Sequence, residues 1–536
     1  MKKFFIYFAF VFSISLSAQT ELVFVFFRDK PNKAAFYSNP LSELSQKSLD
    51  RRTNLGIPLN DQDAPIEASY IAGIEALGFT VTDKSKWLNG VAVNATSAQI
   101  TQLAALSFVQ SVESFVKNPS GGIISPNERK SKFPNQSTEK TNFDYGTANS
   151  QIEQINLKLL HQAGFTGSGI TIAMLDTGYP TVNTGNAYKR LRDNGKIKGG
   201  YNFISKNNDL YNSSFNSHGA ICLGATGGYL EGQFTGSAPD ADYYLFVTEH
   251  GDLEIPEEEL YWIQAAEEAD RLGVDVISAS LGYGDFFDDT RYNYTYQDMT
   301  GSRSFVARGA QAAAEKGIFV LAANGNEAYS DWNYLLTPAD NEKVFSVGAV
   351  TASNQSSSFS SFGPNYLGVI KPDASARGTS TATVYNNSTT YASGTSLSTP
   401  LAAGGVASFL GAVSPTMSRE AVKNLLRSKS SLYPNYTDQM GYGILNFWDA
   451  YSYYLAANEI SGSQNITLYP NPNSGQFTIE SDSEGTFTIY DFSGKLIYSG
   501  KLAKGENPVT LKAPAGTYQV SVQAGNKKSS RKLVVR

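Results

Sequence analysis

The sequence predicts an α/β domain built on a parallel sheet, with a small α+β domain before it and a small all-β sandwich after it. Three observations predict this order. In the middle of the chain, continuous apolar runs end in Asp or Gly, which is typical of buried parallel strands. Strand-like and helix-like patterns alternate before them, and short strands separated by Gly and Asn turns follow. With 536 residues, the chain is long enough for several domains.

The first residues have the composition of a secretory signal. Lys2 and Lys3 precede an apolar run over 4–12 and a Ser-rich stretch that reaches Ala18. This segment, residues 1–18, is shorter than the ~20 residues that a membrane-spanning helix needs. We therefore expect cleavage after Ala18 and export of the rest of the chain.

Residues 20–116 carry the pattern of a small α+β domain, in which strand-like runs alternate with helix-like ones. These segments are 22–27, 41–55, 68–77, 91–93, 100–106 and 109–116. Residues 117–149 are polar and rich in Pro, Ser, Asn and Lys, which is typical of a protease-accessible linker. We expect a maturation cleavage within this linker.

Asp176 and His218 begin the part of the chain that carries chemistry. Asp176 ends the apolar run 170–175 and precedes Thr177-Gly178, where a sharp turn at the carboxyl end of a strand is expected. His218 starts a segment of small residues that suits a closely packed helix. An Asp-Thr-Gly turn that merely closes a strand is the simpler interpretation of the first motif.

Ser396 is the third candidate. It precedes Pro400 and the apolar run 401–406, which indicates a buried helix with proline in its first turn. A serine at the start of a helix has backbone N–H groups aimed toward a developing oxyanion, although a capping serine would look the same in isolation. Together, one carboxylate, one imidazole and one hydroxyl supply the parts of a proton relay, so the three motifs favour a serine peptidase.

In this order the motifs resemble those of the subtilisin-like serine peptidases, whose Asp, His and Ser follow one another in the same way. The resemblance runs from about 150 to 448 and indicates a peptidase domain at 150–458. It implies that Asp176, His218 and Ser396 form the catalytic triad of a subtilisin-like parallel-sheet domain. It also implies that protein or peptide substrates are hydrolysed through an acyl-enzyme on the serine.

Two further segments resemble family motifs. Asn326 aligns with the asparagine that stabilises the oxyanion, and Ser280-Leu281-Gly282 aligns with the edge that pairs with an extended substrate. Ala323 and Gly325 are expected to line the same substrate site. Asn324 stands where a small apolar residue is usual, so the residues that form the nearby pocket wall are not assigned from the sequence. An Asn-Gly-Asn turn and a core strand followed by a glycine turn are the simpler interpretations.

Other assignments fit less well. An α/β-hydrolase needs a histidine after its nucleophile, and none follows Ser396. A chymotrypsin-like order would use His161, but this residue lies in a helix-like segment and is expected to pack on the surface. A surface binding protein on an inert peptidase scaffold stays open, since Ala220 and Leu397 depart from the usual motifs, although neither transfers protons.

Charge and cysteine content limit the partners. A net charge of -6 argues against nucleic acid, which needs a basic footprint. The single cysteine, Cys222, excludes an internal disulfide and lies one helical turn after His218, where we interpret it as a buried structural thiol. Some related subtilases carry such a cysteine beneath the catalytic histidine, which implies inhibition by bulky mercurials.

Metal motifs are weak in this sequence. It has no His-Glu-x-x-His motif and no paired cysteines, so we expect no cofactor to be required for the chemistry. The resemblance makes structural calcium possible without assigning ligands, so the metal site stays unknown. The acidic run Glu257-Glu258-Glu259 is interpreted as first-turn carboxylates of a helix that follows Pro256.

The flanking domains carry resemblances of their own. Residues 20–116, through the stretch 84–90, resemble the propeptides of secreted Bacteroidota subtilases, which implies a removable intramolecular inhibitor; a permanent substrate-recruiting domain is the alternative. Residues 461–536 resemble the C-terminal sorting domain of the type IX secretion system in Bacteroidota, through the motifs 468–472, 489–495 and 532–535. The resemblance implies that the type IX secretion machinery is a partner and that the protein is secreted or located at the cell surface. A carbohydrate- or protein-binding sandwich is the alternative.

Overall fold

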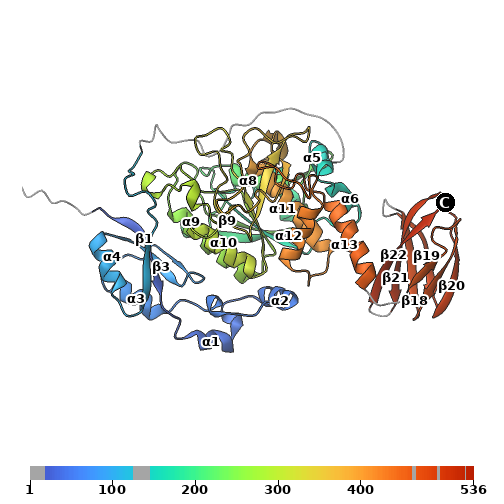
Figure 1. The fold of residues 1–536 in the computed structure, drawn as a ribbon, viewed down its shortest axis with the longest axis horizontal. Helices are drawn as coiled ribbons and strands as arrows, with labels where there is room; N and C mark the ends of the chain where they lie inside the picture. The colour runs from blue at the N-terminus through green and yellow to red at the C-terminus, as the bar shows by residue number, and fades with distance from the viewer. Residues whose placement is uncertain (1–18, 125–144, 462–465, 492–494, 525–526) are drawn as a thin grey trace, which may run out of the picture.

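The computed structural model describes residues 19–124, 145–461, 466–491, 495–524 and 527–536. The predicted signal segment at 1–18 and the part of the predicted linker at 125–144 lie outside these residues. Figure 1 shows a central α/β part, with the N-terminal domain on one side of it and the C-terminal strands at the far end. The predicted order of an α+β domain, a parallel-sheet domain and an all-β domain is confirmed.

Within the described residues, the central part is built on a seven-stranded parallel sheet with strand order β13-β12-β11-β10-β5-β9-β6. Its strands are β5 (Thr171–Asp176), β6 (Ile197–Asn202), β9 (Asp242–Val247), β10 (Val276–Ala279), β11 (Phe319–Ala323), β12 (Phe345–Val350) and β13 (Ala374–Arg377). In β5, Ile172 and Met174 enter one hydrophobic core, whereas Ala173 and Leu175 enter the other. Both faces of the sheet are covered, which explains the continuous apolar runs of the sequence.

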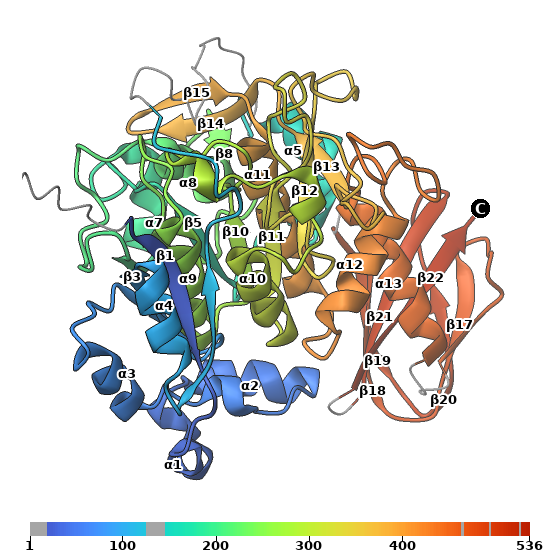
Figure 2. The same ribbon diagram turned by 60° about the vertical axis from the view of Figure 1, so that its left-hand side comes forward.

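Helices cover the two faces of this sheet (Figures 1 and 2). They are α5 (Asn149–Gln154), α6 (Leu157–Gln162), α7 (Lys189–Asp193), α8 (His218–Gly227), α9 (Glu257–Leu272), α10 (Phe305–Glu315), α11 (Thr395–Ala412), α12 (Arg419–Ser428) and α13 (Phe447–Ser461), with short 3-10 turns η4 (Asn186–Tyr188), η5 (Thr290–Tyr292) and η6 (Tyr296–Asp298). Helices α8 and α11 pack against each other on one face, and α9 and α10 pack together on the other. In the part of the chain that the structure describes, no helix has both the length and the apolar character needed to cross a membrane.

Two small hairpins complete the central part. Strands β7 (Tyr229–Leu230) and β8 (Phe234–Thr235) form one, and β14 (Thr381–Tyr385) and β15 (Ser388–Ala392) form the other. Helix α8 packs against β14, so the second hairpin covers the helix that begins at His218.

The N-terminal domain is an antiparallel sheet with strand order β2-β3-β1-β4, and helices cover one of its faces. Its elements are β1 (Glu21–Phe27), α1 (Lys33–Ser38), η1 (Pro40–Ser42), α2 (Gln46–Leu55), η2 (Asp61–Asp63), α3 (Ala68–Glu75), β2 (Asp83–Ser85), β3 (Gly90–Ala95), α4 (Ser97–Ala104) and β4 (Val109–Ser114). Along β1, Val23 and Val25 face the domain's own core, whereas Leu22 and Phe24 enter the core shared with α9 and α10. Strand alternation therefore gives this sheet one face for its own helices and one for the central domain.

Helix α2 lies beside the central domain (Figure 2) and takes part in a buried ion cluster at this interface. Arg51 and Arg52 both pair with Asp270 of α9, and Arg52 Nη2 lies 2.6 Å from Asp270 Oδ2. Asp63 accepts hydrogen bonds from Arg52 at 2.9 Å and from Lys316 Nζ at 2.8 Å. All five side chains are buried. Separating the domains would leave Asp270 and Lys316 without these partners, and an uncompensated buried charge is costly.

Residues 117–124, the first part of the predicted linker, run along the segment 288–291 of the central domain. Lys117 N and Asn118 N both donate to Arg291 O, and Ile124 N donates to Asp288 O at 2.8 Å. Ile123 forms an antiparallel bridge with Asp289. This part of the linker is therefore paired to the central domain through its backbone, while residues 118–120, 122 and 123 are exposed.

The C-terminal part consists of two antiparallel sheets, with strand orders β16-β17-β20 and β19-β18-β21-β22. Its strands are β16 (Thr467–Tyr469), β17 (Gln476–Ser481), β18 (Gly485–Asp491), β19 (Leu496–Leu502), β20 (Gly505–Thr510), β21 (Gly516–Ala524) and β22 (Lys527–Val535). Alternate residues such as Phe477, Ile479, Phe487 and Ile489 form one core between the sheets. This is the packing of a β-sandwich, as the alternating pattern predicts.

Candidate active site

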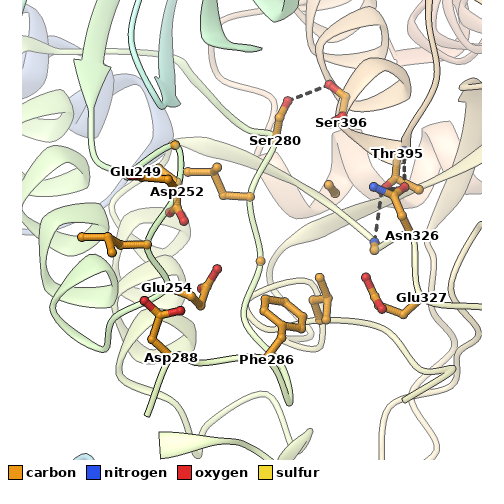
Figure 3. Close-up of a pocket in the computed structure, with 17 residues that line it drawn as sticks. Glu249, Asp252, Glu254, Ser280, Phe286, Asp288, Asn326, Glu327, Thr395 and Ser396 are labelled. Atoms are coloured by element: carbon orange, nitrogen blue, oxygen red, sulfur yellow. Dashed lines mark hydrogen bonds between the residues drawn. The ribbon is translucent and has the colours of Figure 1, made fainter. Parts of the chain in front are cut away.

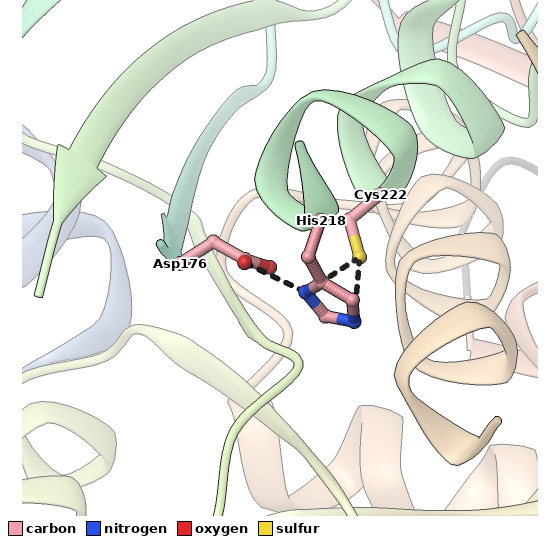
Figure 4. A group of neighbouring side chains, drawn as sticks. All are labelled: Asp176, His218 and Cys222. Carbon is pink, nitrogen blue, oxygen red and sulfur yellow. Dashed lines mark hydrogen bonds and ion pairs between the residues drawn. The ribbon is translucent and has the colours of Figure 1, made fainter. Parts of the chain in front are cut away.

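Asp176 and His218 meet at the carboxyl end of β5 (Figure 4). Both are buried, and Asp176 Oδ1 lies 2.7 Å from His218 Nδ1. Thr177 N also donates to Asp176 Oδ1, at 2.8 Å. A Cβ on Gly219 would lie only 2.5 Å from Gly178 O and 2.9 Å from Asp176 Cβ, so glycine lets the start of α8 come this close to the strand. An ionised carboxylate only accepts hydrogen bonds, so Nδ1 carries the proton and Nε2 is left to act as a base.

Ser396 is the second residue of α11, one residue after the helix begins at Thr395. The sequence predicts proline in the first turn, but Pro400 lies in the second turn, because the helix begins earlier than the apolar run 401–406. Proline has no N–H and cannot donate to the carbonyl four residues before it, which is that of Ser396. In its place, Ser280 Oγ donates to Ser396 O at 2.8 Å, and Cys222 Sγ donates to the same oxygen at 3.3 Å.

Cys222 lies between the histidine and the serine. Its sulfur is 3.8 Å from His218 Nδ1 and 3.9 Å from His218 Nε2, and it also contacts Ser396 O. Burial and the nearby Asp176 charge raise the pKa of the Cys222 thiol well above its usual range. The predicted buried thiol on the face of His218 is confirmed. One sulfur atom in contact with both residues places the imidazole and the serine backbone side by side.

A bulky mercurial is expected to inhibit the protein, because a group bound to Cys222 Sγ would displace an imidazole less than 4 Å away. A displacement of about 1 Å can lower a rate by about 10²-fold. The rate of peptide hydrolysis should therefore fall as the thiol is labelled. Cys222→Ser, whose hydroxyl can still donate to Ser396 O, is the matched control and should resist the reagent. Full activity of the wild-type protein after complete labelling would contradict this geometry.

Asn326 follows β11 and is held by its carbonyl oxygen. Asn326 Oδ1 accepts hydrogen bonds from Thr395 N at 2.8 Å and from Thr395 Oγ1 at 3.0 Å, which leaves Nδ2 to point elsewhere. A Cβ on Gly394, where φ is +147°, would lie 2.7 Å from Ser396 Oγ and 3.5 Å from Asn326 Nδ2. The hydroxyl and the amide therefore face the same small space. The part played by Thr395 was not predicted from the sequence, because it depends on a contact between distant segments.

A cavity of about 310 Å³ opens beside Ser396 and Asn326 (Figure 3). The five residues that the sequence assigns to substrate binding all line it: Ser280, Leu281, Gly282, Ala323 and Gly325. The structure thus brings together segments that follow β10 and β11, at the carboxyl ends of adjacent strands. In open α/β sheets this edge is where ligands bind.

Asn324, the residue that departs from the family pattern, does not line this cavity. It is fully buried, its Nδ2 donates to Ser361 O at 2.7 Å, and its Oδ1 accepts from Ser346 Oγ at 2.7 Å. The side chain therefore points into the domain interior with both polar atoms satisfied. The pocket wall at this point is formed by its neighbours Ala323 and Gly325.

His161 is buried, and the prediction that it packs on the surface is wrong. Its Nε2 lies 3.1 Å from Ser237 O and its Nδ1 lies 3.0 Å from Tyr145 OH. Burial lowers the pKa of His161 to about 4. The polar partners on two other segments explain how the ring is accommodated in the interior, and they could not be predicted from the helix-like segment alone.

Among the residues that the structure describes, two groups of side chains have ligand atoms close enough to hold a cation. Asp176, His218 and Cys222 form one, and Glu249, Glu254 and Glu258 form the other; within each group all ligand atoms lie within 4.8 Å of one another. The first group is already joined by the hydrogen bonds described above. The second is made of buried carboxylates, and carboxylate oxygens suit a hard cation such as calcium. Glu249 and Glu254 come from the loop before α9, for which no site was predicted.

The first-turn carboxylates of α9 are confirmed, and two of them are buried. Glu258 accepts hydrogen bonds from His250 N at 2.7 Å and Ile255 N at 3.2 Å. Glu259 accepts from Tyr294 OH at 2.6 Å and Val306 N at 2.9 Å. These carboxylates therefore fix the loop before α9 and the start of α10.

Three family models match the chain in the order of its three parts. The model described as the peptidase S8 propeptide domain of Bacteroidota matches residues 22–133. The model of the subtilase family matches residues 167–443, just over half of the chain. The model of the secretion system C-terminal sorting domain matches residues 467–536. The middle match spans Asp176, His218 and Ser396.

Characterised proteins are similar to the central part. The serine protease AprX of Bacillus subtilis (strain 168) is 30% identical over 294 residues, which cover 49% of this chain and 61% of that protein. Subtilisin E of the same strain is 30% identical over 306 residues, which cover 55% of this chain and 69% of that protein. Among solved structures, a serine-to-alanine mutant of the epidermin leader peptide processing serine protease from Staphylococcus aureus has a TM-score of 0.53 at 16% identity, covering 81% of this chain and 99% of that chain. At this identity the structural likeness shows the fold alone.

Proposed function

Because the chain belongs to the subtilase family, we propose that it is an exported serine endopeptidase that cleaves peptide bonds through an acyl-enzyme on Ser396. The observation that carries the proposal is the meeting of three segments around one sulfur atom. Cys222 Sγ contacts the His218 ring and Ser396 O, while Asp176 Oδ1 lies 2.7 Å from Nδ1 of the same ring. A carboxylate, an imidazole and a hydroxyl in this order form a proton relay.

In the proposed acylation step, Ser396 Oγ attacks the carbonyl carbon of the scissile bond while His218 Nε2 takes the hydroxyl proton. Asp176 holds Nδ1 and stabilises the imidazolium that forms. The tetrahedral intermediate then collapses, the C–N bond breaks, and the imidazolium gives its proton to the leaving amine. A water molecule, deprotonated by the same imidazole, hydrolyses the ester and restores the Ser396 hydroxyl.

The oxyanion of the tetrahedral intermediate needs donors that are already in place. Ser396 N lies in the first turn of α11, where backbone N–H groups have no acceptor within the helix and the helix dipole is positive. Asn326 Nδ2 supplies a second donor, since Thr395 binds the carbonyl end of the amide and fixes its orientation. Donors held in this way need no reorganisation when charge develops.

Asn326→Ala is expected to lower kcat by about 10²–10³-fold with little change in KM, the magnitude known for the equivalent asparagine of subtilisin. The loss should appear in kcat because the amide acts on the charge that forms in the transition state. Steady-state kinetics on a reporter peptide measures it. Asn194→Ala, at an exposed position after α7, is the control and should behave as wild type. An unchanged kcat for Asn326→Ala would show that donors other than Asn326 stabilise the oxyanion.

The flanking domains support an exported zymogen. The chain carries a C-terminal sorting domain, which marks it for secretion or attachment at the cell surface. The N-terminal domain belongs to a propeptide type and acts as an intramolecular inhibitor. Its extension at 117–124 pairs with residues 288–291, and Asp288 lines the cavity beside Ser396. The extension therefore lies where a substrate chain would approach, which suits inhibition before maturation.

Digestion of an unfolded protein by the mature secreted form tests this function. We expect internal fragments, which an endopeptidase releases, and complete inhibition by a fluorophosphonate, which reacts only with an activated serine. Stepwise loss of terminal residues would show that the protein is an exopeptidase and not an endopeptidase. Binding of the protein without hydrolysis and without inhibitor uptake would favour an inert binding protein on a peptidase scaffold.

A further inference from the structure

The cavity beside Ser396 is strongly acidic. Five of the residues that line it are carboxylates, and none of the described lining residues is lysine or arginine. Figure 3 shows four of them together on the side away from Asn326 and Thr395, with the fifth beside Asn326. The five are Glu249, Asp252, Glu254, Asp288 and Glu327. A substrate side chain that enters this space therefore meets negative charge at both ends.

Two of these carboxylates are buried, which raises the cost of their charge. Glu249 is 3% exposed and Glu254 is 5% exposed, and their oxygens lie within 4.8 Å of each other and of Glu258. Glu249 accepts a hydrogen bond from Tyr283 OH at 3.2 Å, a neutral donor. Carboxylates this close together attract a positive group, whose charge lowers their mutual repulsion. The inner end of the cavity is thus complementary to a positive group.

The rest of the lining suits a long aliphatic chain that ends in such a group. Leu253, Leu281, Phe286 and Leu336 also line the cavity. Lysine and arginine bury their methylene groups against apolar surface while the charged end reaches polar partners. We propose that this cavity selects a lysine or arginine side chain of the substrate close to the scissile bond. The proposal rests on the proposed function, because it takes Ser396 as the site of cleavage.

The sequence carries basic residues shortly after the segment that the structure describes beside this cavity. Ile124 N is bound to Asp288 O, and Asp288 lines the acidic side. Only five residues further along the sequence come Arg129 and Lys130, followed by Lys132. An extended chain advances about 3.3 Å per residue, so five residues cover up to ~17 Å. Self-cleavage of the propeptide is therefore expected after one of these basic residues.

The sharpest test uses one pair of substrates on the mature wild-type protein. Two reporter peptides should differ only in arginine or citrulline at the position nearest the cut that a peptide-library digest identifies. Citrulline keeps the shape of arginine and removes its charge. Truncating one side of a close charge pair costs about 2–5 kcal/mol, so we expect kcat/KM to be about 30- to 4 × 10³-fold higher for arginine than for citrulline. Equal kcat/KM values, or a library digest without enrichment of lysine and arginine near the cut, would overturn the proposal.

Variants assign the preference to these carboxylates. Asp252→Asn combined with Glu254→Gln should reduce the ratio of arginine to citrulline hydrolysis toward one, whereas Asp193→Asn, an exposed carboxylate paired with Lys189, should leave it unchanged. An undiminished ratio in the double variant would contradict the assignment. Labelling by a fluorophosphonate distinguishes failure of this proposal from failure of the proposed function. A protein that is labelled on serine but shows no preference for arginine would still be a serine peptidase, and only the proposed specificity would be wrong. If the double variant takes up no label, the proposal is tested by the ratio of arginine to citrulline hydrolysis in the wild-type protein.

Two further experiments test whether a divalent cation fills the cavity and whether the protein cleaves its own linker after basic residues. Repeating the substrate pair with calcium and with EDTA tests a bound metal: a preference for arginine that appears only in EDTA would show that a divalent cation fills the cavity, against the proposal. Incubating the Ser396→Ala precursor with mature enzyme tests self-cleavage. Cuts after Arg129, Lys130 or Lys132 are expected, and cuts confined to uncharged residues of the linker would contradict the proposal.

Discussion

Ser396→Ala is expected to lower kcat by about 10⁶-fold, the magnitude known for the nucleophile of subtilisin. The variant keeps the helix start of α11 and Asn326, so oxyanion stabilisation and substrate binding remain, but no hydroxyl can form the acyl-enzyme. Residual activity should come from these binding groups alone and lie about 10³–10⁴-fold above the reaction in water.

The measurement requires mature protein on both sides of the comparison. The Ser396→Ala precursor should be processed in trans by wild-type enzyme, which is then removed, because an attached propeptide would hide any remaining activity. Ser398→Ala is the matched control: it lies in the same helix, its hydroxyl donates to Thr395 O at 2.9 Å, and its loss should have a small effect. Hydrolysis by Ser396→Ala at more than about a hundredth of the wild-type rate, well above the residue left by the binding groups, would move the nucleophile elsewhere.

Asp176→Asn is expected to lower kcat by about 10⁴-fold, as in the corresponding variants of serine proteases. The amide preserves the size of the side chain, so the fold should be unchanged apart from the hydrogen bond from Thr177 N, which binds the same oxygen as His218 Nδ1 and is lost when the amide nitrogen faces the ring. However, its amide group can donate to His218 Nδ1, which favours the tautomer with the proton on Nε2. In that tautomer the ring cannot take the proton of Ser396.

Kinetics and folding together distinguish this effect from damage to the domain. We expect KM and the melting temperature of Asp176→Asn to stay close to wild type while kcat falls. Asp193→Asn provides the same chemical change at an exposed position of α7. If kcat of Asp176→Asn stayed within tenfold of wild type, Asp176 would not be the residue that orients His218.

Much of the central fold could be predicted because its strands are buried on both faces. The apolar run before Asp176 becomes β5, and the runs before Ser280 and Asn324 become β10 and β11. Such runs are visible in one sequence, since each strand contributes residues to both cores. The assignment of Asp176, His218 and Ser396 to one site came from the order of three local motifs, and their catalytic roles stay predictions that the variants above test.

The remaining parts of the site depend on contacts between distant segments. The start of α11 lies before its apolar run, so the sequence did not reveal the position of Pro400 or the side-chain hydrogen bonds that Ser396 O accepts in place of a helical one. His161 looked like a surface residue because its partners Ser237 and Tyr145 are contributed by other segments. The acidic cavity likewise combines the loop before α9, the segment at Asp288 and the end of β11. No periodic pattern marks such a group.

The central claim is that His218 activates Ser396, and the position of a covalent label tests it most directly. Mature protein should be reacted with a fluorophosphonate, digested, and sequenced by tandem mass spectrometry. We predict a single adduct on Ser396 in the wild-type protein and its loss in His218→Ala. An adduct on any other residue, or undiminished labelling of Ser396 in His218→Ala, would contradict the account.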